Sequence, residues 1–361
     1  MTKTGTIIDN RNLMLDTTKI YNAAWTELNT ALKDAEAADG LAGAIASLEE
    51  NQRQTGFIKD HLTAVERYVY RHPDDLSLFF SLQFNAKRMA RFNGAPVTVP
   101  LDGAEIANGG CFLCRDNVRW QQQGAEMGYE LDVDDLTYHV WMNPFPLMPC
   151  HVVVASTEHE TQEWGHASEG GVDVGRLVHD LVSLASRTPG YVGFYNGVNA
   201  GASIAGHLHY QFFKRPEDLP AFPLEVRSRD DQALPGACAL VTNYPLPVVK
   251  WSGALSAVGE SAVCWIDDWA ERNRKRVHSL TANIIVSANL DGTVTLYFVP
   301  RDRTRPCGEG MSGLTGGLEV LGEVVFSTEQ ERHLIDSGAI DYFVLENILR
   351  SVRTPLFDDR A

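Results

Sequence analysis

The chain has 361 residues, and its 31 basic and 47 acidic side chains give a formal net charge of −16. Hydrophobic residues make up 44% and charged residues 22%, which is ordinary for a globular protein and excludes a disordered or fibrous chain. The pI near 5.1 argues against nucleic acid or an anionic membrane as a partner, because the summed field repels both. A small anionic ligand stays open, since a few local cations can outweigh a distant net charge.

The sequence contains no run of 18 apolar residues, so we expect no membrane span. Its first residues, MTKTGTIIDNRN, lack the apolar core of a secretory signal. Six cysteines in this length are too few for a disulfide scaffold. We therefore expect a cytoplasmic protein, in which a close cysteine pair indicates metal binding or a redox-active dithiol.

The first hundred residues are expected to be helical. A first apolar series recurs near the helical period and consists of Leu15, Ile20, Ala24, Leu28 and Leu32. Thr17 or Thr18 could cap this helix, and Gly40 could end it. A second apolar run covers residues 76–89 and predicts another helix.

Short strand-like runs follow Pro100, at residues 137–142, 151–155, 191–195 and 207–213. A helix is expected over 174–186, a hairpin over 283–299, a linking loop over 251–259 and a final helical stretch over 327–349. Clustered strands with separate helices predict an α+β fold with a mostly antiparallel sheet. We divide the chain into a helical region (1–100), a first half (101–250) and a second half that completes the sheet (251–361).

The run His207-Leu-His-Tyr-Gln211 is the first candidate for chemistry. On a strand, His207, His209 and Gln211 face one side, and burying three such polar groups requires partners. The preceding loop, residues 196–206, is rich in small residues, so its amides could approach an anion closely, and Ser203 adds a hydroxyl donor. The alternative is a polar strand face next to a tight turn.

A second candidate is Cys111-Phe-Leu-Cys114, which is either half of a zinc site or a redox pair. No thioredoxin-like unit surrounds it, so the redox interpretation is weak. His159 and His207 are the further ligands we expect for a closed structural zinc site, with His151 as a rival for the third position. Alternatively, both cysteines are buried small hydrophobic residues.

A third candidate is the run from Pro300 to Pro306, in which Arg301, Arg303 and Arg305 alternate. Guanidinium groups suit bidentate contacts with phosphate, and Lys214 could add charge nearby. The alternative is a solvated loop whose arginines form surface ion pairs.

Together these residues resemble the histidine-triad superfamily, in its branch of galactose-1-phosphate uridylyltransferases and dinucleoside-polyphosphate and GDP-hexose phosphorylases. The segment from Asn196 to Gln211 ends in HxHxQ, as in that branch, instead of HxHxH. The order of the CxxC pair, the 143–146 NPFP turn, the 151–156 strand with His159 and the run 297–301 also matches. The resemblance covers roughly residues 105–310. The segment before HLHYQ lacks the family's common proline and is one residue longer than in the uridylyltransferases.

The resemblance implies a sheet built of two half-barrel-like halves and assigns a role to each motif. His209 corresponds to the nucleophile, Gln211 to the family glutamine and Ser203 to the loop hydroxyl. The implied zinc ligands are Cys111, Cys114, His159 and His207, and the expected phosphate-binding residues are Asn196, Asn199, Gly201, Lys214, Arg301 and Arg303.

The expected activity is nucleotidyl transfer or phosphorolysis at the α-phosphate of a nucleoside diphosphate sugar or dinucleoside polyphosphate. A nucleotidyl-His209 intermediate would pass its nucleotide to phosphate or a sugar phosphate, giving ping-pong kinetics. A glutamine at the third position suits leaving groups that are already phosphates and need no acid. The alternatives are a histidine-triad hydrolase and a nucleotide-binding protein without turnover. No organic cofactor is expected, and a homodimer is an open expectation.

Overall fold

The computed structural model describes residues 10–93, 106–122, 124–229, 231–289 and 291–357. Its strands form a ten-stranded sheet of order β3-β4-β5-β7-β6-β11-β12-β10-β9-β8 and a three-stranded sheet of order β1-β2-β13. Every neighbouring pair in the large sheet is antiparallel. The predicted α+β fold with a mostly antiparallel sheet and a helical N-terminal region is confirmed.

The large sheet is built of β3 (Gly128–Val133), β4 (Leu136–Met142), β5 (Val152–Ser156), β6 (Tyr191–Asn196), β7 (His209–Lys214), β8 (Asp231–Leu234), β9 (Cys238–Val241), β10 (Val248–Gly253), β11 (Leu280–Ala288) and β12 (Val294–Asp302). The small sheet contains β1 (Glu66–Arg71), β2 (Phe79–Phe84) and β13 (Glu323–Phe326). The α-helices are α1 (Asn10–Gln54), α2 (Arg115–Gln121), α3 (Val174–Arg187), α4 (Pro223–Arg227), α5 (Leu255–Arg272), α6 (Gly317–Val320), α7 (Glu329–Asp336) and α8 (Tyr342–Ser351). Short 3-10 helices cover Ala86–Asn93, Asn108–Gly110 and Val277–Ser279.

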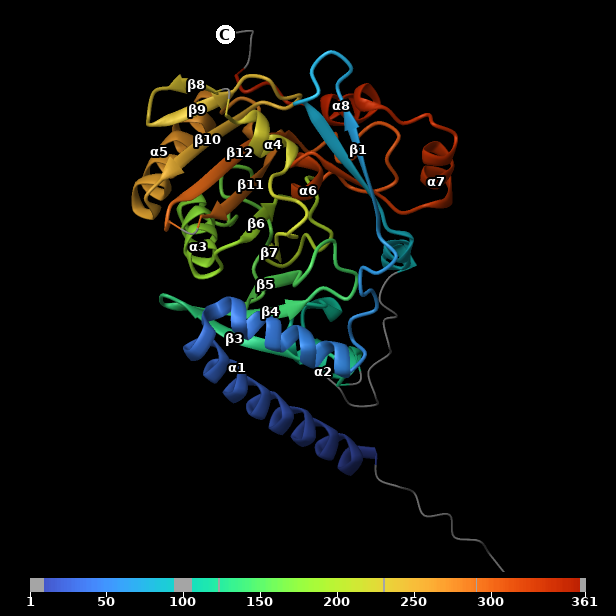
Figure 1. The fold of residues 1–361 in the computed structure, drawn as a ribbon. Helices are drawn as coiled ribbons and strands as arrows, with labels where there is room; N and C mark the ends of the chain where they lie inside the picture. Colours follow the sequence, from blue (N-terminus) through green and yellow to red (C-terminus); the bar gives the residue numbers. More distant parts are fainter. Residues whose placement is uncertain (1–9, 94–105, 123, 230, 290, 358–361) are drawn as a thin grey trace, which may run out of the picture.

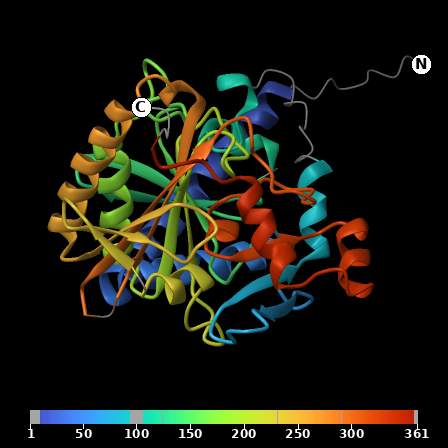
Figure 2. The ribbon, with the colours of Figure 1, turned by 90° about the horizontal axis from the view of Figure 1, so that it is seen from above.

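Helices α3 and α5 cover one face of the large sheet, and the small sheet with α6 and α8 lies on the other side (Figures 1 and 2). Each face has its own buried core. The first contains Leu177, Leu181 and Ile266 from the two helices, and the second contains Phe80, Phe213 and Phe326. The sheet is therefore a buried middle layer, and its central strands can hold side chains away from water.

Helix α1 bends at Gly40, whose backbone has φ +71°, so the glycine ends the first helical segment as predicted. The helix begins at Asn10, so neither Thr17 nor Thr18 is its cap. Its first segment covers the edge strand β3. There the Asn29 amide donates to the Gly128 carbonyl over 3.1 Å, and its side-chain oxygen accepts from the Glu130 N–H over 2.7 Å. This side chain satisfies backbone groups that an open sheet edge would leave unpaired.

The helix expected over residues 76–89 is wrong, because this run contains strand β2 and a 3-10 helix. The apolar run FFSLQF is buried from Phe80 to Phe84, and a fully buried strand has no alternation that would distinguish it from a helix.

The linking loop expected over 251–259 is also wrong, since β10 and α5 occupy it. The final helical stretch forms two helices, α7 and α8. Strand β10 spans the boundary expected after residue 250.

The loop between β6 and β7 packs closely against the loop before α6. Gly201 has φ +106°, and a Cβ atom there would lie 2.4 Å from the Cα of Gly316 and 3.0 Å from the Cγ of Asn196. Only glycine avoids both the backbone strain and the clash. Gly201 therefore joins the loop of the first half to the second half of the chain.

We predict that Gly201→Ala lowers the free energy of unfolding by more than about 1 kcal/mol, because alanine is strained at this backbone angle. Gly206→Ala in the same loop is the matched control, since its Cβ meets no atom within 4 Å. The control should change stability by less than about 0.5 kcal/mol. Urea unfolding followed by tryptophan fluorescence measures both, and equal stability of the two variants would contradict this packing.

Candidate functional site

Strand β7 presents His209 in the middle of the large sheet. It pairs with β5, where Ala155 lies opposite His209, and with β6, where Phe194 lies opposite Gln211. Tyr210 belongs to the core under α3 and Phe213 to the core on the other side. The predicted alternation therefore holds, and His209 and Gln211 face away from α3.

The His209 ring has a defined tautomer. Its Nδ1 lies 2.8 Å from the His207 carbonyl oxygen, which can only accept, so Nδ1 carries the proton. Burial lowers the pKa of His209 to about 4, so the ring is neutral near pH 7. Its Nε2 atom then has a free lone pair, and no residue in the described ranges hydrogen-bonds to it. A neutral imidazole with an available Nε2 is a competent nucleophile.

Gln162 fixes the backbone around His209 and was not predicted from the sequence. Its Oε1 accepts the His209 N–H over 2.7 Å, and its Nε2 donates to the carbonyl oxygens of Asn196 and His209 over 2.8 and 3.0 Å. The side chain is fully buried. It joins the end of β6 to the start of β7, yet it lies in a loop with no motif to mark it.

Cys111, Cys114, His159 and His207 meet in one cluster, with ligand atoms all within 4.8 Å of one another. The Nδ1 atom of His207 lies 3.3 Å from the Cys111 Sγ and 3.5 Å from the Cys114 Sγ. The Nδ1 atom of His159 lies 3.4 Å from the Cys114 Sγ. The four residues predicted as ligands are thus brought together from the loop before α2, the N-cap of α2, the loop after β5 and the approach to β7.

The geometry fits a single tetrahedral ion. With metal–nitrogen and metal–sulfur bonds of about 2.1 and 2.3 Å, a tetrahedral centre separates nitrogen from sulfur by about 3.6 Å. The nitrogen–sulfur distances in the cluster are close to this, at 3.3 to 3.5 Å. The His207 Nε2 lies 2.8 Å from the Ser156 carbonyl oxygen, so Nε2 carries the proton and Nδ1 remains free to coordinate. This cluster can hold a metal ion.

His151, the rival ligand, lies outside this cluster. Its Nδ1 accepts the Leu147 N–H over 3.0 Å, and its Nε2 lies 2.9 Å from the Gln211 Oε1. Both ring nitrogens are therefore engaged elsewhere. His159, rather than His151, lies in the cluster with the two cysteines and His207.

The loop from residue 196 to 206 presents groups of two kinds. Ser203 and Asn199 are exposed, and the Asn199 amide donates to the Arg303 carbonyl over 3.2 Å. Asn196 is buried, and its Oδ1 accepts from the Asn283 amide over 2.8 Å and from the Gly317 N–H over 2.9 Å. The Ser203 and Asn199 side chains are open to solvent, whereas Asn196 fixes the loop.

The predicted basic residues have different environments. The fully buried Arg301 donates from Nη1 to the Asn283 Oδ1 and the Thr315 carbonyl, so it supports Asn196 through Asn283. Burial lowers the pKa of Arg301 to about 10, so it remains a cation at neutral pH. Arg303 is paired with Glu163, as the ion-pair alternative expected. Lys214 is exposed at the end of β7 opposite to His209.

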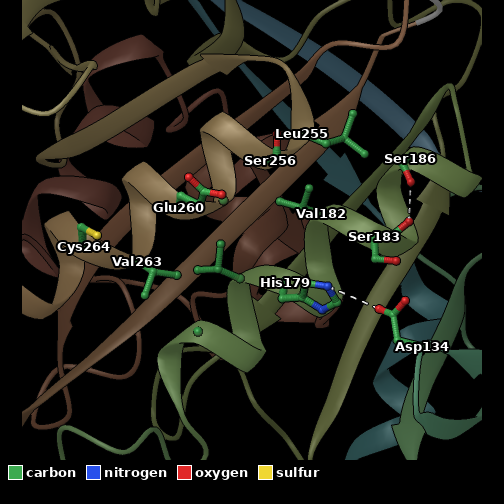
Figure 3. Close-up of a pocket in the computed structure, with 13 residues that line it drawn as sticks. Asp134, His179, Val182, Ser183, Ser186, Leu255, Ser256, Glu260, Val263 and Cys264 are labelled. Atoms are coloured by element: carbon green, nitrogen blue, oxygen red, sulfur yellow. Dashed lines mark hydrogen bonds and ion pairs between the residues drawn. The ribbon is translucent and has the colours of Figure 1, made fainter.

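A separate groove of about 720 Å³ lies between α3 and α5 (Figure 3). These helices cover the face of the large sheet that is opposite to His209. Val178, Val182 and Val263 line this groove. His179 also lines it and points toward Asp134, with 3.3 Å between the His179 Nε2 and the Asp134 Oδ2. None of the predicted site residues lines this groove.

Comparison with known proteins supports the fold. A family described as a domain of unknown function, DUF4922, matches residues 48–214, and no curated protein matches the sequence. Crystal structures of yeast Ap4A phosphorylase Apa2 in complex with AMP and with Ap4A superpose with TM-scores of 0.56 and 0.55, at 17% and 15% sequence identity. A third structure of that protein gives a TM-score of 0.52 at 16% identity.

These alignments cover 85% of this chain and 96 to 98% of the yeast chains. They extend beyond the span of the sequence resemblance. In the described part of the chain, no helix combines the length and apolar character that a membrane crossing requires. The chain shares the fold of these yeast Ap4A phosphorylase structures.

Proposed function

We propose that this protein is a nucleotidyltransferase that cleaves dinucleoside polyphosphates with phosphate as the acceptor. The observation that carries the proposal is the hydrogen bond from His209 Nδ1 to the His207 carbonyl, which leaves the Nε2 lone pair available. The likeness in fold to an enzyme whose structures hold AMP and Ap4A supports the choice of ligand.

In the first step, His209 Nε2 attacks the α-phosphorus. The new bond is Nε2–P, the phosphoanhydride P–O bond breaks, and the leaving nucleoside polyphosphate takes the electron pair. In the second step, an oxygen of inorganic phosphate attacks the same phosphorus, the Nε2–P bond breaks and the neutral ring is restored. Splitting the transfer in this way gives ping-pong kinetics.

The charge that develops on the phosphoryl oxygens needs donors. We assign this role to the Gln211 amide, to Ser203 and to Asn199, whose side chains are not buried. An indirect, supporting role falls to Asn196, Gly201 and Arg301, because their contacts fix the loop that carries Ser203 and Asn199. Arg303 and Lys214 receive no role in the step, because Glu163 engages the first and the second lies at the far end of β7.

We further propose that the Cys111–Cys114–His159–His207 cluster holds Zn²⁺. Two thiolates and two imidazoles fill a tetrahedral shell and leave no open position, which is typical of a structural zinc site. When bound, the ion would crosslink the start of β7 to the CxxC loop. His207 would then be held by the ion at Nδ1 and by Ser156 at Nε2.

Incubation with Ap4A in the absence of phosphate should load the protein with one nucleoside monophosphate. An alkaline quench preserves a phosphorus–nitrogen bond, so the adduct is measured by the mass of the intact protein. His209→Ala should give no adduct and no turnover, because it removes the attacking lone pair. His179→Ala is the control, since His179 lies on α3 and is exposed. An adduct on the His209→Ala protein would contradict the mechanism.

The same incubation separates the alternative functions. A hydrolase releases nucleoside monophosphate without added phosphate, whereas the proposed enzyme releases a nucleoside diphosphate only when phosphate is present. A nucleotide-binding protein without turnover shows a higher melting temperature with Ap4A but no adduct.

Purified protein should contain about one zinc ion per chain, as four ligands in one closed shell imply. Cys114→Ala should lose the ion and melt at a lower temperature, because a structural ion contributes its binding free energy to folding. Cys264→Ser is the control, since this cysteine is exposed and outside the cluster. Elemental analysis and thermal melts measure both effects. A metal-free wild-type protein with a Cys111–Cys114 disulfide would favour the redox interpretation instead.

A further inference from the structure

His151 is a fully buried histidine to which the proposed reaction gives no role. The Leu147 N–H can only donate, so the Nδ1 atom that it contacts over 3.0 Å must accept. The proton of the neutral ring is therefore on Nε2. That N–H points to the Gln211 Oε1 over 2.9 Å.

This tautomer decides the orientation of the Gln211 amide. If the amide were flipped, its NH2 group would face the His151 N–H, and the donor of a fully buried ring would lose its acceptor. The oxygen end of Gln211 is thus held by His151, and the NH2 end is turned away from it. Without such a partner, a glutamine can present either its donor or its acceptor end to an anion, and only the donor end stabilises a phosphoryl group.

His151 is itself held from the small sheet. The Leu147 carbonyl accepts from the Gln83 amide of β2 over 2.9 Å, so the backbone that carries the Leu147 N–H is fixed. The ring also packs edge-on against Phe213, with centroids 6.2 Å apart. Burial, and then the nearby Arg88 guanidinium, lower the pKa of His151 to about 3, which favours the neutral ring.

We propose that His151 is a positioning residue that locks the Gln211 amide with its N–H groups toward the reacting phosphate. The inference rests on the proposed function for the identity of that anion. It assigns to the HxHxQ motif a partner outside the motif, 60 residues earlier in the chain. The contact with His151 also explains how Gln211, the third residue of the motif, can offer only its N–H groups to the phosphate.

A double-mutant cycle tests the proposal. His151→Phe keeps a ring against Phe213 but removes both nitrogens, and we expect kcat with Ap4A and phosphate to fall by roughly tenfold to a hundredfold while KM changes less than about twofold. Gln211→Ala should lower kcat by at least as much. If His151 acts through Gln211, the double variant should match Gln211→Ala within about twofold. A double variant whose loss equals the product of the two single losses would overturn the proposal, as would an unchanged kcat in His151→Phe.

A conservative variant separates positioning from structural support. Gln211→Glu retains an oxygen for the His151 N–H but presents no donor to the phosphate. It should therefore keep the melting temperature of the wild-type protein while losing kcat. A loss of stability with unchanged kcat would assign the His151–Gln211 contact to the fold alone.

Nitrogen-15 spectra of the histidine rings test the geometry without activity. The wild-type protein should show a proton on the His151 Nε2 that exchanges slowly, and Gln211→Ala should lose this protection. A proton on Nδ1 would overturn the inference whatever the turnover. The predicted spectrum in a protein that forms no adduct would instead contradict the proposed function.

Discussion

An imidazole that contacts a backbone group has no choice of tautomer, and this constraint governs the candidate site. The His207 carbonyl fixes the proton of His209 on Nδ1, and the Ser156 carbonyl fixes that of His207 on Nε2. The two histidines therefore carry their protons on opposite nitrogens, which leaves a lone pair on Nε2 of His209 and on Nδ1 of His207. His207 supplies its ring to the Cys111–Cys114–His159–His207 cluster and its carbonyl oxygen to His209. The short segment from His207 to His209 therefore connects the candidate metal site to the proposed nucleophile.

Residues of the second half of the chain support this backbone. Asn283 of β11 donates to Asn196, and Arg301 of β12 donates to Asn283. The loop around Gly316 packs on Gly201. These contacts cross from one half of the sheet to the other. Removing water from such a network strengthens each hydrogen bond in it, but it also makes each unpaired group costly. At Gly201 the positive φ and the nearby Gly316 backbone, rather than a hydrogen bond, exclude a larger residue.

The sequence was informative where chemistry and periodicity coincide. The CxxC pair and the two predicted histidines lie together in one cluster, and few other residue types form such a ligand set. The HxHxQ motif indicated a strand with one polar face, and strand β7 begins at His209. The sequence was uninformative where the role of a residue depends on a contact with a residue far away in the chain. Arg303 resembles a phosphate ligand until Glu163, 140 residues earlier, is seen to bind it. The spacing could not decide between His151 and His159, and nothing in the sequence marked Gln162.

The most direct test of the account is the atom of attachment in the nucleotidyl-protein. The tautomer of His209 leaves only Nε2 free, so phosphorus-31 and nitrogen-15 spectra of the isolated adduct should show phosphorus bonded to the Nε2 of His209. Phosphorus on Nδ1, or on any other side chain, would contradict the account.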